Sequence, residues 1–235
     1  RPSLSQPVLY EEVNCVGTLH LLEAAVAHGR PPFLFASSSS VYGINSKLPF
    51  SEDDPIDRPI SPYATTKRAG ELHVFNAHHL HGLPAWCLRF FTVYGPRQRP
   101  EMAIARFIRS LEEDRPIPFY GDGSSRRDYT YIDDIADGVE AALEATPGFE
   151  IVNLGGARPV TLSELVAAIE KATGRTARLS RQPVQPGDVP ITYASVEKAE
   201  RLLRFRARVP LADGLSRSVE WFRQQNAVAG KRPVA

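Results

Sequence analysis

The sequence predicts an α/β fold built on a parallel sheet, because helical and strand patterns alternate along it with short connections. Residues 10–28 carry apolar side chains at helical spacing, and the short apolar run 33–36 has the character of a buried strand. A second helical segment, 63–81, leads in the same way to a second apolar run, 85–91. Strands joined by helices are expected to run parallel, with the helices covering the faces of one sheet.

Capping residues place the ends of these helices. Gly29 and Gly82 each follow a helical pattern, in the position where a left-handed residue ends a helix. The pair Ser-Pro at 61–62 begins the second helix, with serine as N-cap and proline at the first helical position. Further along, Thr-Leu-Ser-Glu at 161–164 forms a capping box, and the helix that it opens is expected to end at Gly174.

Beyond Pro96 the elements become shorter, and we divide the chain there into residues 1–96 and 97–235. The elements expected after this point are helices near 103–113, 132–145 and 215–222, and strands at 117–120 and 151–154.

Composition indicates an ordinary globular protein with no global preference for a charged partner. Charged residues make up 23% of the chain, and 28 basic and 27 acidic residues leave a net charge of +1, so neither a nucleic acid nor a membrane partner is expected. No apolar run reaches the length of a membrane span, and the first residues do not form a signal peptide. Both cysteines, Cys15 and Cys87, have apolar neighbours, which favours reduced core thiols in a cytoplasmic protein.

Tyr63 and Lys67 stand four residues apart near the start of the second helix, so both side chains should lie on one helix face. A fixed ammonium beside a phenol favours the phenolate and lowers the tyrosine pKa from about 10 towards neutrality. A hydroxyl from the serine run 37–40 could then hold or relay a proton. These residue types predict proton abstraction from an alcohol that is being oxidised; the alternative is an exposed pair without function.

Three histidines, His78, His79 and His81, cluster at the end of the same helix. No further ligand stands at metal-binding spacing on that turn, and cations are favoured at a helix C-terminus in any case. We therefore expect no metal.

Four segments together resemble the extended branch of the short-chain dehydrogenases/reductases, the NAD-dependent nucleotide-sugar epimerases and dehydratases. The segments are Asn-Cys-Val-Gly-Thr at 14–18, Ser-Ser-Ser-Ser-Val-Tyr-Gly at 37–43, Tyr-Ala-Thr-Thr-Lys at 63–67 and Arg-Arg-Asp-Tyr-Thr-Tyr-Ile-Asp-Asp at 126–134. They occur in the family's order and at its usual spacing, over essentially the whole chain.

The resemblance implies a partial Rossmann-type sheet whose N-terminal strands are absent, with a smaller C-terminal α/β region that binds substrate. Residues 1–96 would be the C-terminal part of the NAD-binding domain and 97–235 mainly the UDP-sugar region, with the strand near 151–154 able to return to the Rossmann sheet. The family's glycine-rich pyrophosphate loop is not in this sequence, so we expect roughly 80–90 further residues upstream. The fragment alone should then be inactive, and the full-length protein a homodimer that pairs the helices 10–28 and 63–81.

The family's catalytic residues map onto Tyr63 as the base, Lys67 as its partner and Ser38 as the catalytic serine. The resemblance implies transient oxidation at C4 of a UDP-sugar, and it places Ser37, Tyr63, Lys67 and Asn14 near NAD. Dehydratases and decarboxylases of the family carry acids where this chain has Ser39 and Ser40, which favours an epimerase. A buried hydrogen bond to backbone is the structural alternative for Asn14.

The segment Phe-Thr-Val-Tyr-Gly-Pro-Arg-Gln-Arg-Pro-Glu-Met at 91–102 looks more like the UDP-glucuronate 4-epimerases than the UDP-galactose 4-epimerases, and it indicates the substrate residues. Thr92, Arg99, Ser39 and Ser40 form a candidate clamp for a C6 carboxylate, since arginine can bind carboxylate bidentately. The alternative is that Arg97 and Arg99 only cover the mouth of a loop.

UDP contacts map onto two further residues. Arg127 matches the arginine that meets the diphosphate, and Asp188 matches an acid near the uridine ribose; Gln185 stands where galactose epimerases have a second arginine. A salt bridge with Asp128 or Asp133 is the alternative for Arg127.

The function predicted from the sequence is therefore NAD-dependent 4-epimerisation of UDP-glucuronate to UDP-galacturonate. Two other functions stay open: a UDP-glucose/UDP-galactose 4-epimerase, and a catalytically silent nucleotide-sugar binding module. Without a cofactor-binding half, the sheet would also expose an unpaired apolar edge that favours aggregation.

Overall fold

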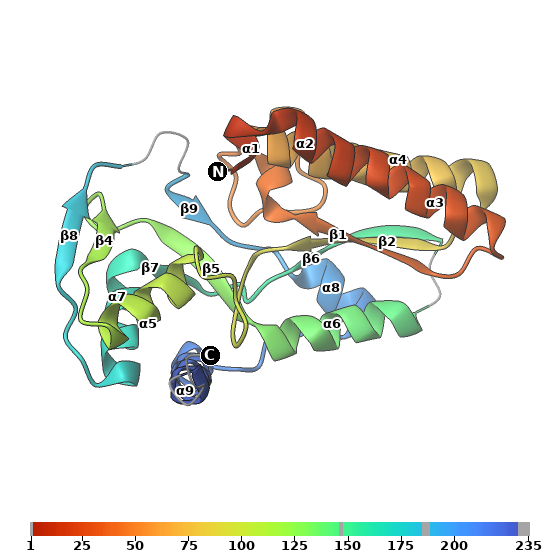
Figure 1. The fold of residues 1–235 in the computed structure, drawn as a ribbon. Coiled ribbons are helices and arrows are strands. Elements are labelled where there is room, and N and C mark those ends of the chain that lie inside the picture. Colours follow the sequence, from red (N-terminus) through yellow and green to blue (C-terminus); the bar gives the residue numbers. More distant parts are fainter. Residues whose placement is uncertain (1, 146–147, 185–188, 230–235) are drawn as a thin grey trace, which may run out of the picture. The chain divides into compact units, whose positions relative to one another are not determined.

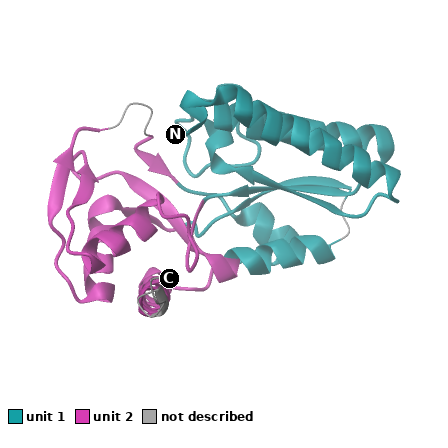
Figure 2. Ribbon diagram, viewed as in Figure 1, with its two compact units in different colours: residues 1–91, 135–157, 193–206 teal, residues 92–134, 158–192, 207–235 magenta. Residues whose placement is uncertain are grey.

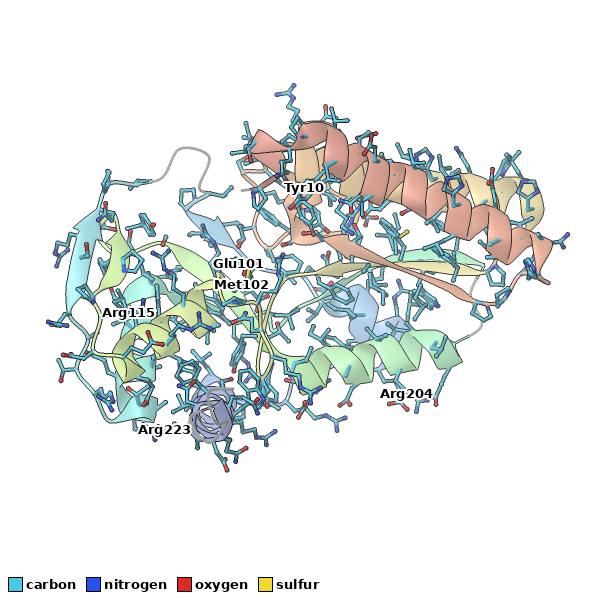
Figure 3. All side chains as sticks on the ribbon, viewed as in Figure 1. Tyr10, Glu101, Met102, Arg115, Arg204 and Arg223 are labelled. Carbon is cyan, nitrogen blue, oxygen red and sulfur yellow. The ribbon has the colours of Figure 1, made fainter. Side chains whose placement is uncertain are left out.

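The computed structural model describes residues 2–145, 148–184 and 189–229 (Figure 1). The chain forms two compact units: unit 1 comprises residues 1–91, 135–157 and 193–206, and unit 2 comprises 92–134, 158–192 and 207–235 (Figure 2). The first crossing between units lies near the expected division at residue 96. After that point the chain returns twice to unit 1, because later segments pair with or pack on its sheet.

Unit 1 is built on a three-stranded parallel sheet in the order β1-β2-β6. The strands are β1 (Phe33–Ser38), β2 (Ala85–Phe90) and β6 (Phe149–Leu154). Phe33 pairs with Ala85, which pairs in turn with Phe149, so the three strands start level with one another. The expected α/β class with a parallel sheet is confirmed, and the central strand β2 is the most apolar and the most buried, as a parallel core strand should be.

Helices lie on both faces of this sheet (Figure 1). One face carries α4 (Pro62–His81) beside a nearly continuous helical segment of α2 (Pro7–Glu11), a π-helical turn (Glu12–Val16) and α3 (Gly17–Ala27). The other face carries α8 (Glu197–Leu203) and the unit 1 part of α6 (Ile132–Glu144). The helices expected at 10–28 and 63–81 are confirmed, whereas the π-helical turn and the short α1 (Pro2–Ser5) were not predicted.

The core of unit 1 lies between the sheet and the helices α3 and α4. Leu22, Phe35, Val74, Leu83 and Cys87 form a buried cluster there. Both cysteines of the chain are free and buried, as expected from their apolar neighbours. Burial raises the pKa of the Cys15 thiol to about 11, so this group is an inert thiol at neutral pH.

The loop that follows β1 is anchored at both of its ends. Gly43 has a φ of +54°, and a Cβ there would lie 2.0 Å from the Arg58 carbonyl oxygen, so the close approach of the loop requires glycine. Further on, the Asp54 carboxylate accepts hydrogen bonds from Asn45 Nδ2 and the Ser51 backbone N–H. Burial alone would raise the pKa of Asp54, but these donors and the Lys47 ammonium lower it below its ordinary value.

Unit 2 is made of short strands and three helices within the described residues. Its elements are β3 (Thr92–Tyr94), α5 (Ala103–Glu112), β4 (Ile117–Tyr120), β5 (Arg126–Tyr131), β7 (Pro159–Thr161), α7 (Leu162–Thr173), β8 (Leu179–Gln182), β9 (Ile191–Thr192) and α9 (Leu211–Ala229). In one sheet β5 pairs with β3, β7 and β9, and in another β4 pairs with β8. Residues from α5, α7 and α9 fill a single core.

Local sequence signals in unit 2 agree well with the structure. The capping box is present: Thr161 Oγ1 accepts from the Glu164 N–H, while the Glu164 carboxylate accepts from the Thr161 N–H. Gly174 ends that helix in the left-handed conformation, as predicted. The last helix is longer than expected, at Leu211–Ala229, because the prediction used only its apolar positions.

In the described ranges, none of the helices combines the length and the apolar character that crossing a membrane requires.

A test of the helix–sheet packing is available at Gly70, where a Cβ would lie 2.2 Å from Phe35 Cζ. We expect Gly70→Ala to lower the free energy of unfolding by about 1–3 kcal/mol, because the added methyl overpacks the interface between α4 and β1. Urea denaturation measures the change.

The matched control is Gly17→Ala, also in a helix, where the nearest atom to the new Cβ is the Glu12 carbonyl oxygen at 3.8 Å. That variant should be neutral or more stable by about 0.5–1 kcal/mol, since alanine favours helix. Equal stabilities for the two variants would contradict the packing described here.

Candidate functional site

The helix α4 presents Tyr63 and Lys67 from its first two turns. Ser61 is the N-cap and its Oγ accepts a hydrogen bond from the Ala64 N–H at 3.2 Å, with Pro62 as the first helical residue. The Lys67 ammonium lies 5.8 Å from the centroid of the Tyr63 ring. The i,i+4 spacing therefore brings the two groups together on one face, as predicted.

Lys67 also ties this helix to the sheet. Its Nζ donates a hydrogen bond to the Ala36 carbonyl oxygen at 2.9 Å, close to the carboxyl end of β1. The same ammonium lies 5.2 Å from the Phe35 ring centroid, which removes part of its hydration. This burial lowers the pKa of Lys67 from its ordinary value. An ammonium has three donors, so two remain for a ligand after the bond to Ala36.

Ser38 lies at the end of β1 and caps the 3₁₀-helix formed by Ser39–Tyr42. Its Oγ accepts two hydrogen bonds, from the Ser40 backbone N–H at 3.2 Å and from the Ser40 hydroxyl at 2.9 Å. With two hydrogen bonds accepted from Ser40, the Ser38 hydroxyl can donate its own proton to a further group. The 3₁₀-helix packs against α4, which carries Tyr63.

Asn14 and Ser37 support these groups from the layer behind. Asn14 Nδ2 donates to Thr66 Oγ1 at 2.9 Å, and Thr66 Oγ1 in turn donates to the Tyr63 carbonyl oxygen at 2.9 Å. Asn14 thus braces the first turn of α4 through a side-chain partner. Ser37 is buried, and its hydroxyl donates to Glu71 Oε1 at 2.6 Å.

Of the remaining predicted residues, Ser39 begins the 3₁₀-helix in unit 1, and the others belong to unit 2 or lie outside the described ranges. Thr92 begins β3 and Arg127 lies in β5, where its Nη1 donates to the Arg126 carbonyl oxygen at 2.9 Å. Arg99 is 74% exposed and forms an ion pair with Glu101, with 3.4 Å between Nε and Oε1. Asp188, together with Gln185, falls outside the described residues.

The sequence left a salt bridge with Asp128 or Asp133 as the alternative role for Arg127. Asp133 instead forms an ion pair with Arg217 at 3.3 Å.

A metal site is not formed in the described part of the chain, where no group of three His, Cys, Asp or Glu side chains could hold an ion. Of the three clustered histidines, His78 has Nδ1 at 3.0 Å from the Leu83 carbonyl oxygen and stacks on Phe149. Its surroundings are those of a packed helix end.

Sequence reasoning missed one group of residues behind the site. Arg89 lies in the buried strand β2 and forms an ion pair with the equally buried Glu71 of α4. The signal was a single arginine inside the apolar run 85–91, because a charge on a central strand must find a partner.

The described residues fit one end of NAD. Lys67, with two N–H donors available beside Tyr63, can hold the hydroxyls of a nicotinamide ribose. No segment of this sequence has the glycine-rich pattern that cradles a pyrophosphate.

Comparisons with known proteins agree on one group. Residues 1–155 match the NAD dependent epimerase/dehydratase family. The chain is 42% identical to the UDP-glucuronate 4-epimerase of Thermodesulfobacterium geofontis over 225 residues. This match covers 95% of this chain and 69% of that protein.

Two solved structures show the same fold. The UDP-glucuronic acid 4-epimerase of Bacillus cereus, in complex with UDP-glucuronic acid and NAD, superposes with a TM-score of 0.85 at 39% identity, over 90% of this chain and 68% of that one. The UDP-glucose 4-epimerase of Thermotoga maritima, with UDP-glucose, gives a TM-score of 0.91 at 31% identity, over 95% and 74% of the two chains.

The electrostatics of Lys67 can be tested directly. We expect its ammonium to titrate below the ordinary value of 10.5, because burial disfavours the charged form. Since the unfolded state then binds more protons, this group makes the protein more stable as pH rises from the lowered folded-state pKa to 10.5.

NMR of ¹³C-dimethylated lysines would follow this titration, with the resonance assigned by its absence in Lys67→Arg. A midpoint at or above 10.5 would show that the ammonium is hydrated.

Proposed function

Because the chain belongs to the NAD dependent epimerase/dehydratase family, we propose that the native protein catalyses the 4-epimerisation of a UDP-sugar, with UDP-glucuronate as its substrate and with this chain supplying the proton-handling residues. The observation that carries this proposal is the arrangement of hydroxyl donors and the base in unit 1. Tyr63 lies beside the ammonium of Lys67, and Ser38 has both acceptor positions filled by Ser40. These three side chains can remove the proton of an alcohol and return it, and none of them is a carboxylate.

The reaction needs a hydride acceptor and a proton path. NAD, when bound, would supply the hydride acceptor for oxidation at C4 and the hydride donor for the later reduction. Tyr63, as the phenolate, takes the proton of the C4 hydroxyl as that carbon is oxidised, and gives it back when the inverted alcohol forms. The ammonium of Lys67 lies beside the Tyr63 ring, and its remaining N–H groups would hold the nicotinamide ribose.

Ser38 acts on the sugar oxygen itself. Since its oxygen accepts from Ser40, its proton can be donated to the C4 oxygen in both the alcohol and the ketone. This orientation keeps the substrate within reach of Tyr63 while the hydride is transferred.

Inversion is favoured over elimination by the residues beside Ser38. Dehydration requires a base that removes a C5 proton, and the positions nearest to Ser38 hold only Ser39 and Ser40. The Ser40 hydroxyl is hydrogen-bonded to Ser38 and is not basic at neutral pH. The absence of a carboxylate at these two positions favours turnover and reduction of the 4-keto sugar over elimination.

The catalytic assignment predicts that Tyr63→Phe and Ser38→Ala lower kcat for epimerisation, by about 10²–10⁴-fold for the loss of proton transfer at Tyr63. Tyr10→Phe is the matched control, because its ring lies edge-on to that of Tyr63 with 6.1 Å between centroids. It should retain wild-type kcat.

The rate is measured with the native protein by separating the two C4 epimers chromatographically. A Tyr63→Phe protein that keeps more than a tenth of wild-type kcat would refute the assignment of Tyr63 as the base.

The substrate proposal rests on Arg99. Its guanidinium is exposed, and an exposed ion pair like that with Glu101 is weak, so a substrate carboxylate can compete for it. Thr92, which begins β3 in the same unit, adds a hydroxyl donor of the kind that a carboxylate accepts. A bound C6 carboxylate would also be held back from decarboxylation while C4 is a ketone.

Arg99→Ala should lower kcat/KM for UDP-glucuronate about tenfold or more, the scale of a lost charge-assisted hydrogen bond. Turnover of UDP-glucose should change little, and release of CO₂ from UDP-glucuronate should rise. Arg109→Ala, a substitution of an exposed arginine on α5, serves as control for the loss of positive charge.

Paired assays with both UDP-sugars check this prediction. Wild-type preference for UDP-glucose, or an Arg99→Ala protein without change on UDP-glucuronate, would favour the neutral-sugar epimerase instead.

A homodimer is the second part of the proposal. The outer surfaces of α3 and α4, which lie side by side on one face of the sheet, expose apolar side chains (Figure 1). Those on the helical segment 7–27 include Val13, Val16 and Leu19, and those on α4 include Leu72 and Phe75. Exposed apolar side chains on two neighbouring helices of one face are typical of an association site.

Leu72→Lys should shift the protein from dimer to monomer, because it buries a charge at the contact. Leu143→Lys on α6 is the control, since Leu143 is 56% exposed against 47% for Leu72 but lies away from this surface. Light scattering after gel filtration gives the masses; a Leu72→Lys dimer would exclude this face.

A further inference from the structure

We propose that the buried ion pair of Glu71 and Arg89 is a positioning device for Ser38, which holds both ends of the segment that carries this hydroxyl. The inference rests on the proposed function, in which Ser38 donates to the sugar oxygen. Neither residue is expected to touch the substrate.

The ion pair is bidentate and buried. Arg89 Nε lies 2.8 Å from Glu71 Oε1, and Arg89 Nη2 lies 2.9 Å from Glu71 Oε2. Glu71 stands two turns beyond Tyr63 on α4, and Arg89 is near the end of the central strand β2. The pair therefore fixes the helix that carries the base against the strand next to β1.

One arm of the pair reaches the residue before Ser38. The Ser37 hydroxyl donates to Glu71 Oε1 at 2.6 Å, so the end of β1 is tied to the carboxylate. A charged acceptor makes this bond short and directional.

The other arm reaches Tyr42, where the 3₁₀-helix that follows Ser38 ends. Arg89 Nη1 donates to the Tyr42 hydroxyl at 3.0 Å, and this hydroxyl donates to Asn153 Oδ1 at 2.7 Å. Burial raises the pKa of Tyr42 to about 12, so the group stays protonated and keeps donating at neutral pH. Asn153 is held in turn, since its Nδ2 donates to the Phe50 carbonyl oxygen at 2.9 Å.

Ser38 thus lies in a short segment whose two flanks, Ser37 and Tyr42, are fastened to the same ion pair. Within that segment, Ser40 supplies both hydrogen bonds that orient Ser38. A buried ion pair is weak evidence for stability, because apolar side chains of similar volume often serve a core equally well. What apolar side chains cannot supply is direction, and both arms of this pair are directional hydrogen bonds.

The mildest test is Tyr42→Phe, which keeps the ring and removes only the hydroxyl that joins Arg89 to Asn153. In the native protein we expect kcat to fall about tenfold, the scale of a small misplacement of a catalytic group, with little change in KM. Ser218→Ala is the matched control: it removes a buried hydroxyl that donates to the Gly214 carbonyl oxygen in unit 2, and kcat should stay unchanged.

A double-mutant cycle with Ser38→Ala separates positioning from a general loss of structure. If Tyr42 acts through Ser38, Tyr42→Phe should have no further effect on kcat in the Ser38→Ala protein. An equal fold loss in both backgrounds would overturn the inference, as would an unchanged kcat in Tyr42→Phe alone.

Crystal structures give a readout that does not depend on activity. Ser38 should occupy more than one rotamer, or move, in Tyr42→Phe and keep a single rotamer in Ser218→Ala. A Ser38 that stays in place would overturn the positioning role even if the protein proves to be an epimerase. A displaced Ser38 in a protein that does not epimerise UDP-sugars would instead refute the proposed function alone.

Discussion

The contact between α4 and the carboxyl end of β1 is the interaction on which the candidate site depends. Lys67, Gly70 and Glu71 stand at positions i, i+3 and i+4, so they share the helix face that meets this strand. Lys67 donates to a strand carbonyl, Gly70 leaves room for an aromatic ring, and Glu71 accepts from Ser37. A shift of the helix along the strand would break all three contacts at once.

Polar groups buried behind the site turn this packing into a defined geometry. Arg89, Ser37 and the partly exposed Arg68 all donate to the carboxylate of Glu71. A network that is satisfied in this way is rigid, because each bond has a direction and a lost bond leaves a desolvated charge. Proton transfer needs rigid surrounding residues, because a small misplacement of the donor lowers the rate strongly.

Local signals predicted much of the fold and less of the site. Helix ends followed from Ser61, Gly82, Thr161 and Gly174, because capping depends on neighbours within a few residues. The strands β3, β7 and β9 have two or three residues each, too few for a periodic pattern, and only pairing with β5 defines them. The π-helical turn was missed because apolar spacing alone does not distinguish it from an α-helical turn.

The sequence by itself determined the types of reacting groups, the common face of Tyr63 and Lys67, and the motifs of the family, since all of these are set by local spacing. Tertiary structure alone decided the partners of Ser38, the bond from Lys67 to β1 and the ion pair behind them. The link from Tyr42 to Asn153 joins residues 111 positions apart. Local spacing carries no information about such a pair, because its distance is set only when strands and helices pack together.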